Sequence, residues 1–154
     1  MHQRIRRFDR ILKLRENDRK TEQSILAEER REERDVLDEI FSLEGEKSKA
    51  MEDFCCDCGQ TFSCAELWFQ RQFIASLDDH IDAGKESLSD VRRRIAGTEA
   101  RLVERHRDVK VMESYVAGLK EEALKVRFEA EQLELDDIAM LRYSRMKGEA
   151  SHEA

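Results

Sequence analysis

The residues of this chain best suited to chemistry are its four cysteines, three of which crowd residues 55–58. Cys55 and Cys58 have the C-x-x-C spacing of a zinc knuckle, and Gly59 suits the tight turn that a knuckle needs. Cys64 follows six residues after Cys58 and is a candidate third ligand. The cluster therefore raises the hypothesis of a metal or redox site.

A fourth ligand is harder to find, because His80 lies sixteen residues beyond Cys64 and no H-x3–5-H pair follows the cysteines. The remaining histidines are scattered, at His2, His106 and His152. We therefore favour small thiol side chains at a turn, and we expect no metal and no cofactor. A metal or redox sensor built on the cysteines is kept as an alternative.

No other group of residues indicates catalysis. The chain has no phosphate-binding glycine loop, no HExxH pair, and no serine or cysteine with a plausible histidine partner. Paired acids such as Asp78-Asp79 fit the solvated face of a helix better than an active site. We predict that the protein is not an enzyme.

The element that must carry these residues is marked by a long seven-residue repeat. Counting alternately three and four residues from Leu67 to Met140 gives 22 positions, of which 17 are apolar, and the chain contains no proline. Such a repeat predicts one helix whose apolar seam packs against another helix. At about 1.5 Å per residue the helix would be roughly 120 Å long.

A weaker repeat precedes it, starting at Ile5, with nine of sixteen positions apolar. Charged residues interrupt its middle, and we expect a loose seam around residues 15–33. The interrupting residues are Arg15, Arg19, Glu22, Glu29 and Glu33.

The two repeats are separated by a turn signal. Gly59 is a residue expected at a helix end, and Ser63-Cys-Ala-Glu66 fits a capping box. A short turn between long helices predicts an antiparallel coiled-coil hairpin, and the glycine and the unequal repeats argue against the rival, a parallel dimer. The expected parts are a helix over about 3–57, a turn over 58–62, a helix over 63–146 and a flexible tail over 147–154.

Folding at Gly59 pairs positions whose numbers add up to about 120, so Ile5 should meet the region of Val116. The second helix should then overhang its partner over 117–146. Its apolar side chains there need a cover that the first helix does not supply.

Composition and charge narrow the function. Charged residues make up 41% of the chain and aromatic residues 6%, as in long helices with solvated outer faces. No apolar run is long enough to span a membrane and the N-terminus lacks an apolar signal region, so we expect a cytoplasmic protein without membrane insertion. Residues 1–20 are basic and 129–154 acidic. Without an aromatic stacking pattern and with a net charge of −7, nucleic acid is not an expected partner.

Aromatic residues gather near the turn, with Trp68, Phe69 and Phe73 partly outside the seam and Phe54 and Phe62 nearby. Exposed aromatic side chains on a thin hairpin are candidates for a partner contact. The alternative is that they only close the end of the hairpin.

Three stretches carry a resemblance to a known family: the basic opening 4–16 with its Leu-Arg-Glu ending, the segment 61–67 followed by 70–77, and the charged C-terminal helix with its tail. Together they resemble the YscO/FliJ family, the small helical-hairpin stalk proteins of type III protein export. The likeness covers nearly the whole chain. Its second stretch is most similar to the YscO branch, whereas the cysteine cluster is not a family hallmark.

The resemblance implies a monomeric stalk, similar to that of rotary ATPases, at the cytoplasmic face of the secretion apparatus. Both chain ends would enter the hexameric export ATPase, the turn end would meet the export gate membrane protein, and the stalk would handle export chaperones. The residues expected at the ATPase end are Arg4, Arg6, Arg7, Arg10, Phe128, Leu133, Leu135, Ile138 and Leu141. Those expected at the partner-binding tip are Leu37, Phe41, Glu44, Trp68, Phe69, Phe73 and Leu77.

Two further alternatives remain. A generic coiled-coil scaffold or tether would self-associate through the overhang and ignore ATPases. Within the family, the stalk would belong either to a virulence injectisome or to a flagellar export system, and the YscO-like segment favours the injectisome.

Overall fold

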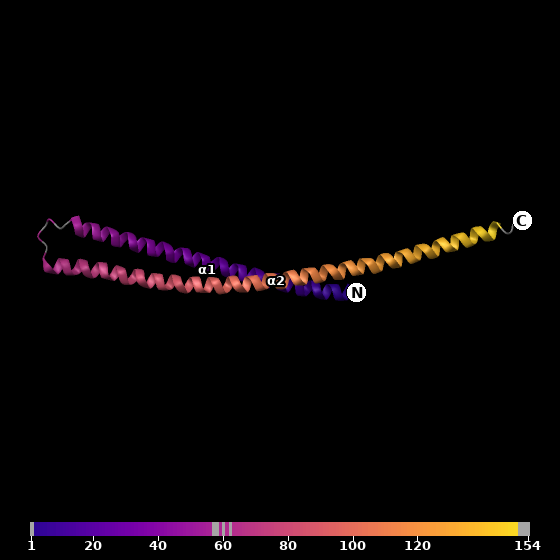
Figure 1. The fold of residues 1–154 in the computed structure, drawn as a ribbon, viewed down its shortest axis with the longest axis horizontal. Helices are drawn as coiled ribbons and strands as arrows, with labels where there is room; N and C mark the ends of the chain where they lie inside the picture. The colour runs from indigo at the N-terminus through magenta and orange to yellow at the C-terminus, as the bar shows by residue number, and fades with distance from the viewer. Residues whose placement is uncertain (1, 57–58, 60, 62, 151–154) are drawn as a thin grey trace. The chain divides into compact units, whose positions relative to one another are not determined.

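The protein is two long helices, as seen in a computed structural model that describes residues 2–56, 59, 61 and 63–150. Helix α1 spans His2–Cys56 and helix α2 spans Cys64–Ala150, with no strand among these residues. The helices pack against each other and run in opposite directions (Figure 1), so the predicted antiparallel hairpin with a longer second helix is confirmed. None of the described stretches combines the length and apolarity needed to cross a bilayer.

Helix α2 begins with the capping box that the sequence predicts. The Ser63 amide donates to Glu66 Oε2 at 3.0 Å, and the Glu66 amide donates in return to Ser63 Oγ at 3.3 Å. Gly59 has no positive φ, so a left-handed glycine cap does not end α1. Residue 57 of the expected first helix, residues 58, 60 and 62 of the expected turn, and 151–154 of the expected tail lie outside the described residues. Helix α2 stays helical through Ala150, into the expected tail.

The molecule divides into two units, each containing part of both helices. Unit 2 comprises Asp18–Glu104 and unit 1 comprises Met1–Asn17 with Arg105–Ala154. In unit 2 the core is a single row of apolar side chains contributed by both helices. Its buried members are Leu26, Ile40, Leu77, Ile81 and Val91.

Gly84 lets the two helices of unit 2 approach closely. A Cβ atom at this position would lie 2.9 Å from Ile40 Cγ1, closer than a real contact allows. Ion pairs flank the row of apolar residues, for example Arg92 with Glu33 at 2.8 Å and Arg94 with Glu32 at 2.6 Å. These pairs are largely exposed and stabilise little, so the apolar row holds the helices together.

The two helices stay packed together along the charged repeat positions of α1 that belong to unit 2. The expectation of a loose seam is therefore wrong for this part of α1. Every repeat position from Arg19 to Glu33 is at least half-buried. Glu22 accepts from Arg101 at 3.3 Å, whereas Glu29 Oε2 is buried without a hydrogen-bond partner. Long charged side chains cover the seam with their methylene groups, so charge alone does not open it.

Unit 1 is built on Val109, Val116 and Leu119 of α2, which are buried against the start of α1. Phe8 meets Tyr115 edge to face, with the ring centroids 4.9 Å apart. The N-terminal end of α1, in indigo, and the orange part of α2 lie side by side here (Figure 1). Helix α2 continues beyond the N-terminus of α1 (Figure 1).

The pairing of the helices differs from the predicted one by about one helical turn. Ile40 approaches Gly84 and Arg15 pairs with Asp108, so paired numbers add up to about 124 rather than 120. Ile5 borders a groove lined also by Lys120 and Ala123. This shift brings α2 positions as far as Ala123 under α1. The predicted overhang over 117–146 is therefore wrong at its start, because the cover ends only at residue 123.

Candidate functional site

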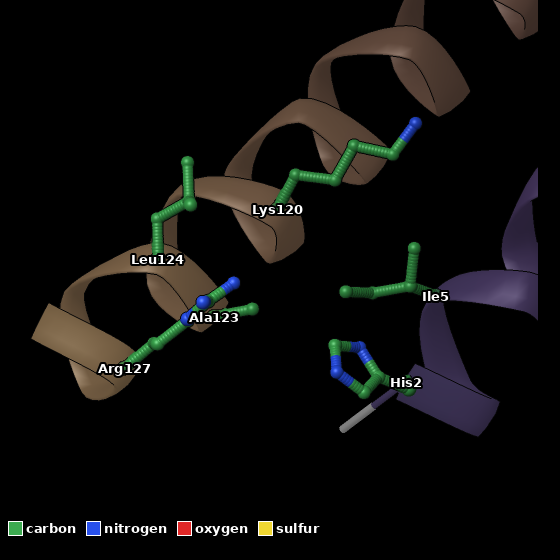
Figure 2. A pocket seen from close by; sticks show the side chains of 6 residues that line it. All are labelled: His2, Ile5, Lys120, Ala123, Leu124 and Arg127. Carbon is green, nitrogen blue, oxygen red and sulfur yellow. The ribbon is translucent and has the colours of Figure 1, made fainter. Parts of the chain in front are cut away.

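The cover over α2 ends in a groove of about 330 Å³ between the start of α1 and α2. Ile5 and Ala123 point toward each other across it (Figure 2). Lys120 and Arg127 belong to its rim, but their charges are engaged, Lys120 with Asp9 at 3.1 Å and Arg127 with Glu131 at 2.9 Å. The groove is the point at which the apolar seam of α2 becomes accessible.

Beyond this groove α2 has no neighbour in the described structure, and each residue from 124 to 147 is exposed. We call residues 124–147 the uncovered stretch. Its large apolar side chains are Leu124, Val126, Phe128, Leu133, Leu135, Ile138, Met140, Leu141, Tyr143 and Met146. Monomeric proteins rarely expose contiguous apolar patches above a few hundred Å², so this stretch has the character of a contact surface.

The uncovered stretch is also strongly acidic in its middle. Residues 128–141 contain five carboxylates and no lysine or arginine. Only Glu131 makes an ion pair among the described residues of this segment. The segment thus combines exposed apolar groups with carboxylates that lack local partners.

The start of α1 in the same unit is basic. Arg4 donates from Nη2 to the Tyr115 hydroxyl at 2.8 Å, which anchors it on α2. Arg6, Arg7 and Arg10 are exposed, and no ion pair is formed by them within the described chain. The first turn of α1 holds no acid either, so carboxylates of a partner could pair with these cations.

The structure places the expected ATPase-end residues in unit 1, the arginines on the first turns of α1 and the apolar residues on the uncovered stretch of α2, most of which α1 does not reach. Two residues at this end of the molecule are not marked by the sequence pattern. Leu124 lies outside the seven-residue repeat, and Tyr115 is held by an aromatic contact and a hydrogen bond that periodicity does not reveal.

The tip residues expected on α2 lie in unit 2 and separate into two kinds. Trp68, Phe69 and Phe73 are exposed, and the Trp68 and Phe69 rings pack edge to face at 5.2 Å. Leu77, in contrast, is only 5% exposed and belongs to the core. Leu77 therefore stabilises the hairpin and offers no surface to a partner.

The expected α1 members of the tip do not lie opposite Phe73 and Leu77. Asp78 pairs with Lys47, and Glu44 pairs with Lys85 at 3.8 Å. Glu44 thus sits about two turns further along α2 than Leu77, and Leu37 and Phe41 precede it on α1. Phe41 is nevertheless 80% exposed, so it is available for contacts at its own position.

The cysteines do not form a metal centre within the described structure. Cys55 and Cys64 are exposed free thiols, while Cys58 and the side chain of Cys56 lie outside the described part. His80 is sixteen residues along α2 from Cys64, or about 24 Å at ~1.5 Å per residue, too far for a shared ion. No group of three potential ligands occurs among the described residues.

Comparison with known proteins identifies a family. Residues 3–148 match the model of the FliJ family, described as flagellar FliJ protein. No curated protein and no solved structure matches the chain. The FliJ family is a non-enzymatic component of flagellar and type III protein export.

Proposed function

Because the chain belongs to the FliJ family, we propose that it is a central-stalk-like component of a type III secretion apparatus, at its cytoplasmic face. In this role it docks, as a monomer, in the hexameric export ATPase and links it to the export gate and to export chaperones. It performs no chemistry itself.

The observation that carries this proposal is the end of the cover over α2 after Ala123. A seven-residue repeat that is buried up to this point continues without a partner through Met140. Exposing so much apolar surface is unfavourable in water, and a protein partner that covers it would recover that free energy. The cationic start of α1 lies in the same unit and supplies a charged rim to the docking end.

The tip offers a second and separate contact surface. Trp68, Phe69 and Phe73 are exposed near the start of α2, and large aromatic side chains dominate many protein interfaces. We assign this group, with Phe41 at its own place on α1, to the export gate. Leu77 is excluded from the assignment because it is buried.

We infer an injectisome rather than a flagellum from the YscO-like segment 61–77. The matched family model bears the flagellar name, and the family alone supports either system. The two readings differ in the ATPase that the stalk prefers, so binding to an injectisome and a flagellar export ATPase side by side distinguishes them.

The proposal is tested by the rate of ATP hydrolysis of the export ATPase encoded beside this chain, measured over a concentration series of the protein. We expect saturable stimulation. Deleting residues 128–154 should abolish it while leaving the paired part of the hairpin folded, since paired core residues such as Val109 and Val116 are untouched.

The matched control replaces Trp68 and Phe73 by alanine. This variant should stimulate the ATPase like the wild type and bind the export gate more weakly. If the folded wild-type protein neither binds nor stimulates the ATPase, the proposed role is wrong.

A further inference from the structure

Three arginines of α2 reach across the seam of unit 2 to glutamates of α1. The ion pairs are Arg92 with Glu33 at 2.8 Å, Arg94 with Glu32 at 2.6 Å, and Arg101 with Glu22 at 3.3 Å. In each pair the residue numbers add up to about 124, as they do at Ile40 and Gly84. The pairs therefore mark the register, that is, which residues of the two helices lie level with each other.

Each of these glutamates has a second acid four residues before it, about one turn of helix away. The earlier acids are Asp18 before Glu22, Glu28 before Glu32, and Glu29 before Glu33. Within the described chain none of the earlier acids forms an ion pair, and Glu29 Oε2 is buried without a hydrogen-bond partner. Moving α1 by one turn toward its own C-terminal end would therefore bring an unpaired acid to each of the three arginines.

The reverse movement of α1 offers no such exchange. The residues four positions after the three glutamates are Leu26, Val36 and Leu37, and none of them can form an ion pair with an arginine. The charge pattern of α1 thus favours a shift in one direction only.

The apolar part of the seam accepts the same shift. Ile40 now lies against Gly84, where a Cβ atom would be only 2.9 Å from Ile40 Cγ1. Val36, one turn earlier on α1, is smaller than isoleucine and lines a groove of about 380 Å³ together with Gly84 and Ala83. Because the groove leaves room beside Gly84, Val36 can take the place of Ile40 without overpacking.

A buried polar side chain also fits both registers. Thr98 is fully buried, and Arg101 Nη2 donates to its hydroxyl oxygen at 2.9 Å. Numbers that add up to about 124 place Thr98 level with Leu26, and after a shift of one turn it would be level with Glu22. The Glu22 carboxylate can accept a hydrogen bond from the Thr98 hydroxyl. Glu22 would thus exchange its partner Arg101 for another partner inside the seam.

We propose that unit 2 has a second stable register, in which α1 is moved by one turn, about 6 Å, along α2. Asp18, Glu28 and Glu29 then hold the three arginines. The observed register is the resting one, because the shift breaks other pairs between the helices, such as Arg30 with Glu99 at 3.0 Å. Exposed pairs contribute little each, so a partner that binds the shifted register more tightly can reverse the balance.

The shift changes the surface of unit 2 near its turn. Phe41 is exposed on α1, and Trp68, Phe69 and Phe73 are exposed on α2. Moving α1 by one turn displaces Phe41 along the α2 aromatic residues by about 6 Å. A protein that contacts both helices would therefore distinguish the two registers. The second register itself does not depend on the proposed function, which enters only where the export gate is that protein.

Disulfide trapping in the full chain tests for the second register. The four native cysteines are replaced by serine, and Gly84→Cys is combined with one cysteine on α1. Ile40→Cys reports the observed register, and Val36→Cys reports the shifted one. Leu43→Cys is the matched control, because Leu43 lies about one turn from Ile40 on the other side and lines the same groove. The Val36→Cys and Leu43→Cys variants also carry Ile40→Ala, so that the new side chain at position 84 meets no isoleucine.

The measurement is the rate of disulfide formation in a glutathione redox buffer, followed by mass spectrometry. A disulfide forms only where the two Cα atoms come within about 7 Å. We expect the fastest closure with Ile40→Cys, and closure with Val36→Cys that is several times faster than with Leu43→Cys. Equal rates for Val36→Cys and Leu43→Cys would show motion without a preferred direction and would overturn the second register.

Charge variants in the same background test what stabilises the shifted register. Asp18→Asn, Glu28→Gln and Glu29→Gln are combined, because single exposed pairs contribute little. We expect them to slow closure with Val36→Cys and to leave closure with Ile40→Cys unchanged. The opposite set, Glu22→Gln, Glu32→Gln and Glu33→Gln, should speed closure with Val36→Cys.

Circular dichroism of each variant must match the parent for these rates to be compared. If neither set of charge variants changes the ratio of the Val36→Cys rate to the Leu43→Cys rate, the acids do not define a second register. None of these measurements involves the export ATPase or the gate, so a negative result would leave the proposed function standing.

Discussion

Two parts of α2 in unit 1, residues 105–123 and 124–147, share one helix and one continuing repeat but differ in cover. Leu119 in the first part is 5% exposed, and Leu133 in the second, two seven-residue repeats further on, is 67% exposed. The first turns of α1 lie over the first part only, as the contacts of Phe8 and Asp9 show.

The difference shows that the repeat creates an apolar helix face that must be covered, but that it does not determine what covers this face. Where α1 lies alongside α2, it covers this face, and the repeat residues form the core of the hairpin. Where α1 has ended, the same pattern stays exposed, and in the proposed function another protein covers it. The proposed docking depends on this contrast between the covered and the exposed part of the repeat.

The largest expected effect comes from placing a charge at Val109. Val109→Asp buries an unpaired carboxylate in the seam and should destabilise the hairpin by several kcal/mol. Circular dichroism should then show unfolding at a lower urea concentration than for the wild type. Leu133→Asp makes the same change in the uncovered stretch, and stability should change by less than about 1 kcal/mol.

The two aspartate variants should behave in the opposite order in binding. Leu133→Asp should lose the ATPase while remaining folded. Equal loss of stability in both variants would show that the uncovered stretch is packed in solution, and the contrast between the two parts would disappear.

Two glycine-to-alanine changes should alter stability by an intermediate amount, and they compare an open position on α2 with a closely packed one. Gly118 has nothing within 4 Å of a new Cβ, so Gly118→Ala should stabilise by about 1 kcal/mol through helix propensity alone. At Gly84 the new methyl group meets Ile40, and overpacking of about 1–3 kcal/mol should cancel or exceed that gain. Thermal unfolding measures both, and a larger gain at Gly84 than at Gly118 would contradict the close packing in unit 2.

A smaller gain in stability is expected where the covered seam is polar. Glu29 Oε2 is buried without a partner, so Glu29→Leu should raise the free energy of unfolding by about 1 kcal/mol. The neighbouring Glu28 is exposed, and Glu28→Leu should be close to neutral. A loss of stability in Glu29→Leu would mean that the carboxylate has a favourable role in the seam, such as a bridging water.

The smallest effect is expected at the start of α2. Ser63→Ala removes one half of the capping box and should cost about 1 kcal/mol or less. Amide exchange of the first turn of α2 should rise more than that of unit 1. A uniform rise along the whole chain would show instead that the cap controls global unfolding.

The fold could be predicted from the sequence because the buried positions follow a regular three-four spacing along each helix. Each three-four position from Ile5 to Phe54 on α1 is buried or half-buried, and so is each from Gln70 to Ala123 on α2. Even charged members such as Glu22 follow the rule, since position along the helix decides which face turns inward.

The register and the grouping of the tip residues could not be predicted in the same way. Sliding one helix by one turn keeps every seam residue in the seam, so periodicity does not distinguish the two pairings. Close packing at Gly84 and the Phe8–Tyr115 contact are set by side-chain shape. Leu77 is itself a seam position of the repeat and is buried as such, and only the family resemblance assigns it to the partner-binding tip.

The most direct measurement is amide hydrogen exchange of this protein, free and bound to its export ATPase. We expect fast exchange in residues 124–147 of the free protein and slow exchange there in the complex, with little change around Val91 in unit 2. If binding protects residues 64–77 and leaves 124–147 exchanging as in the free protein, the uncovered stretch is not the docking segment.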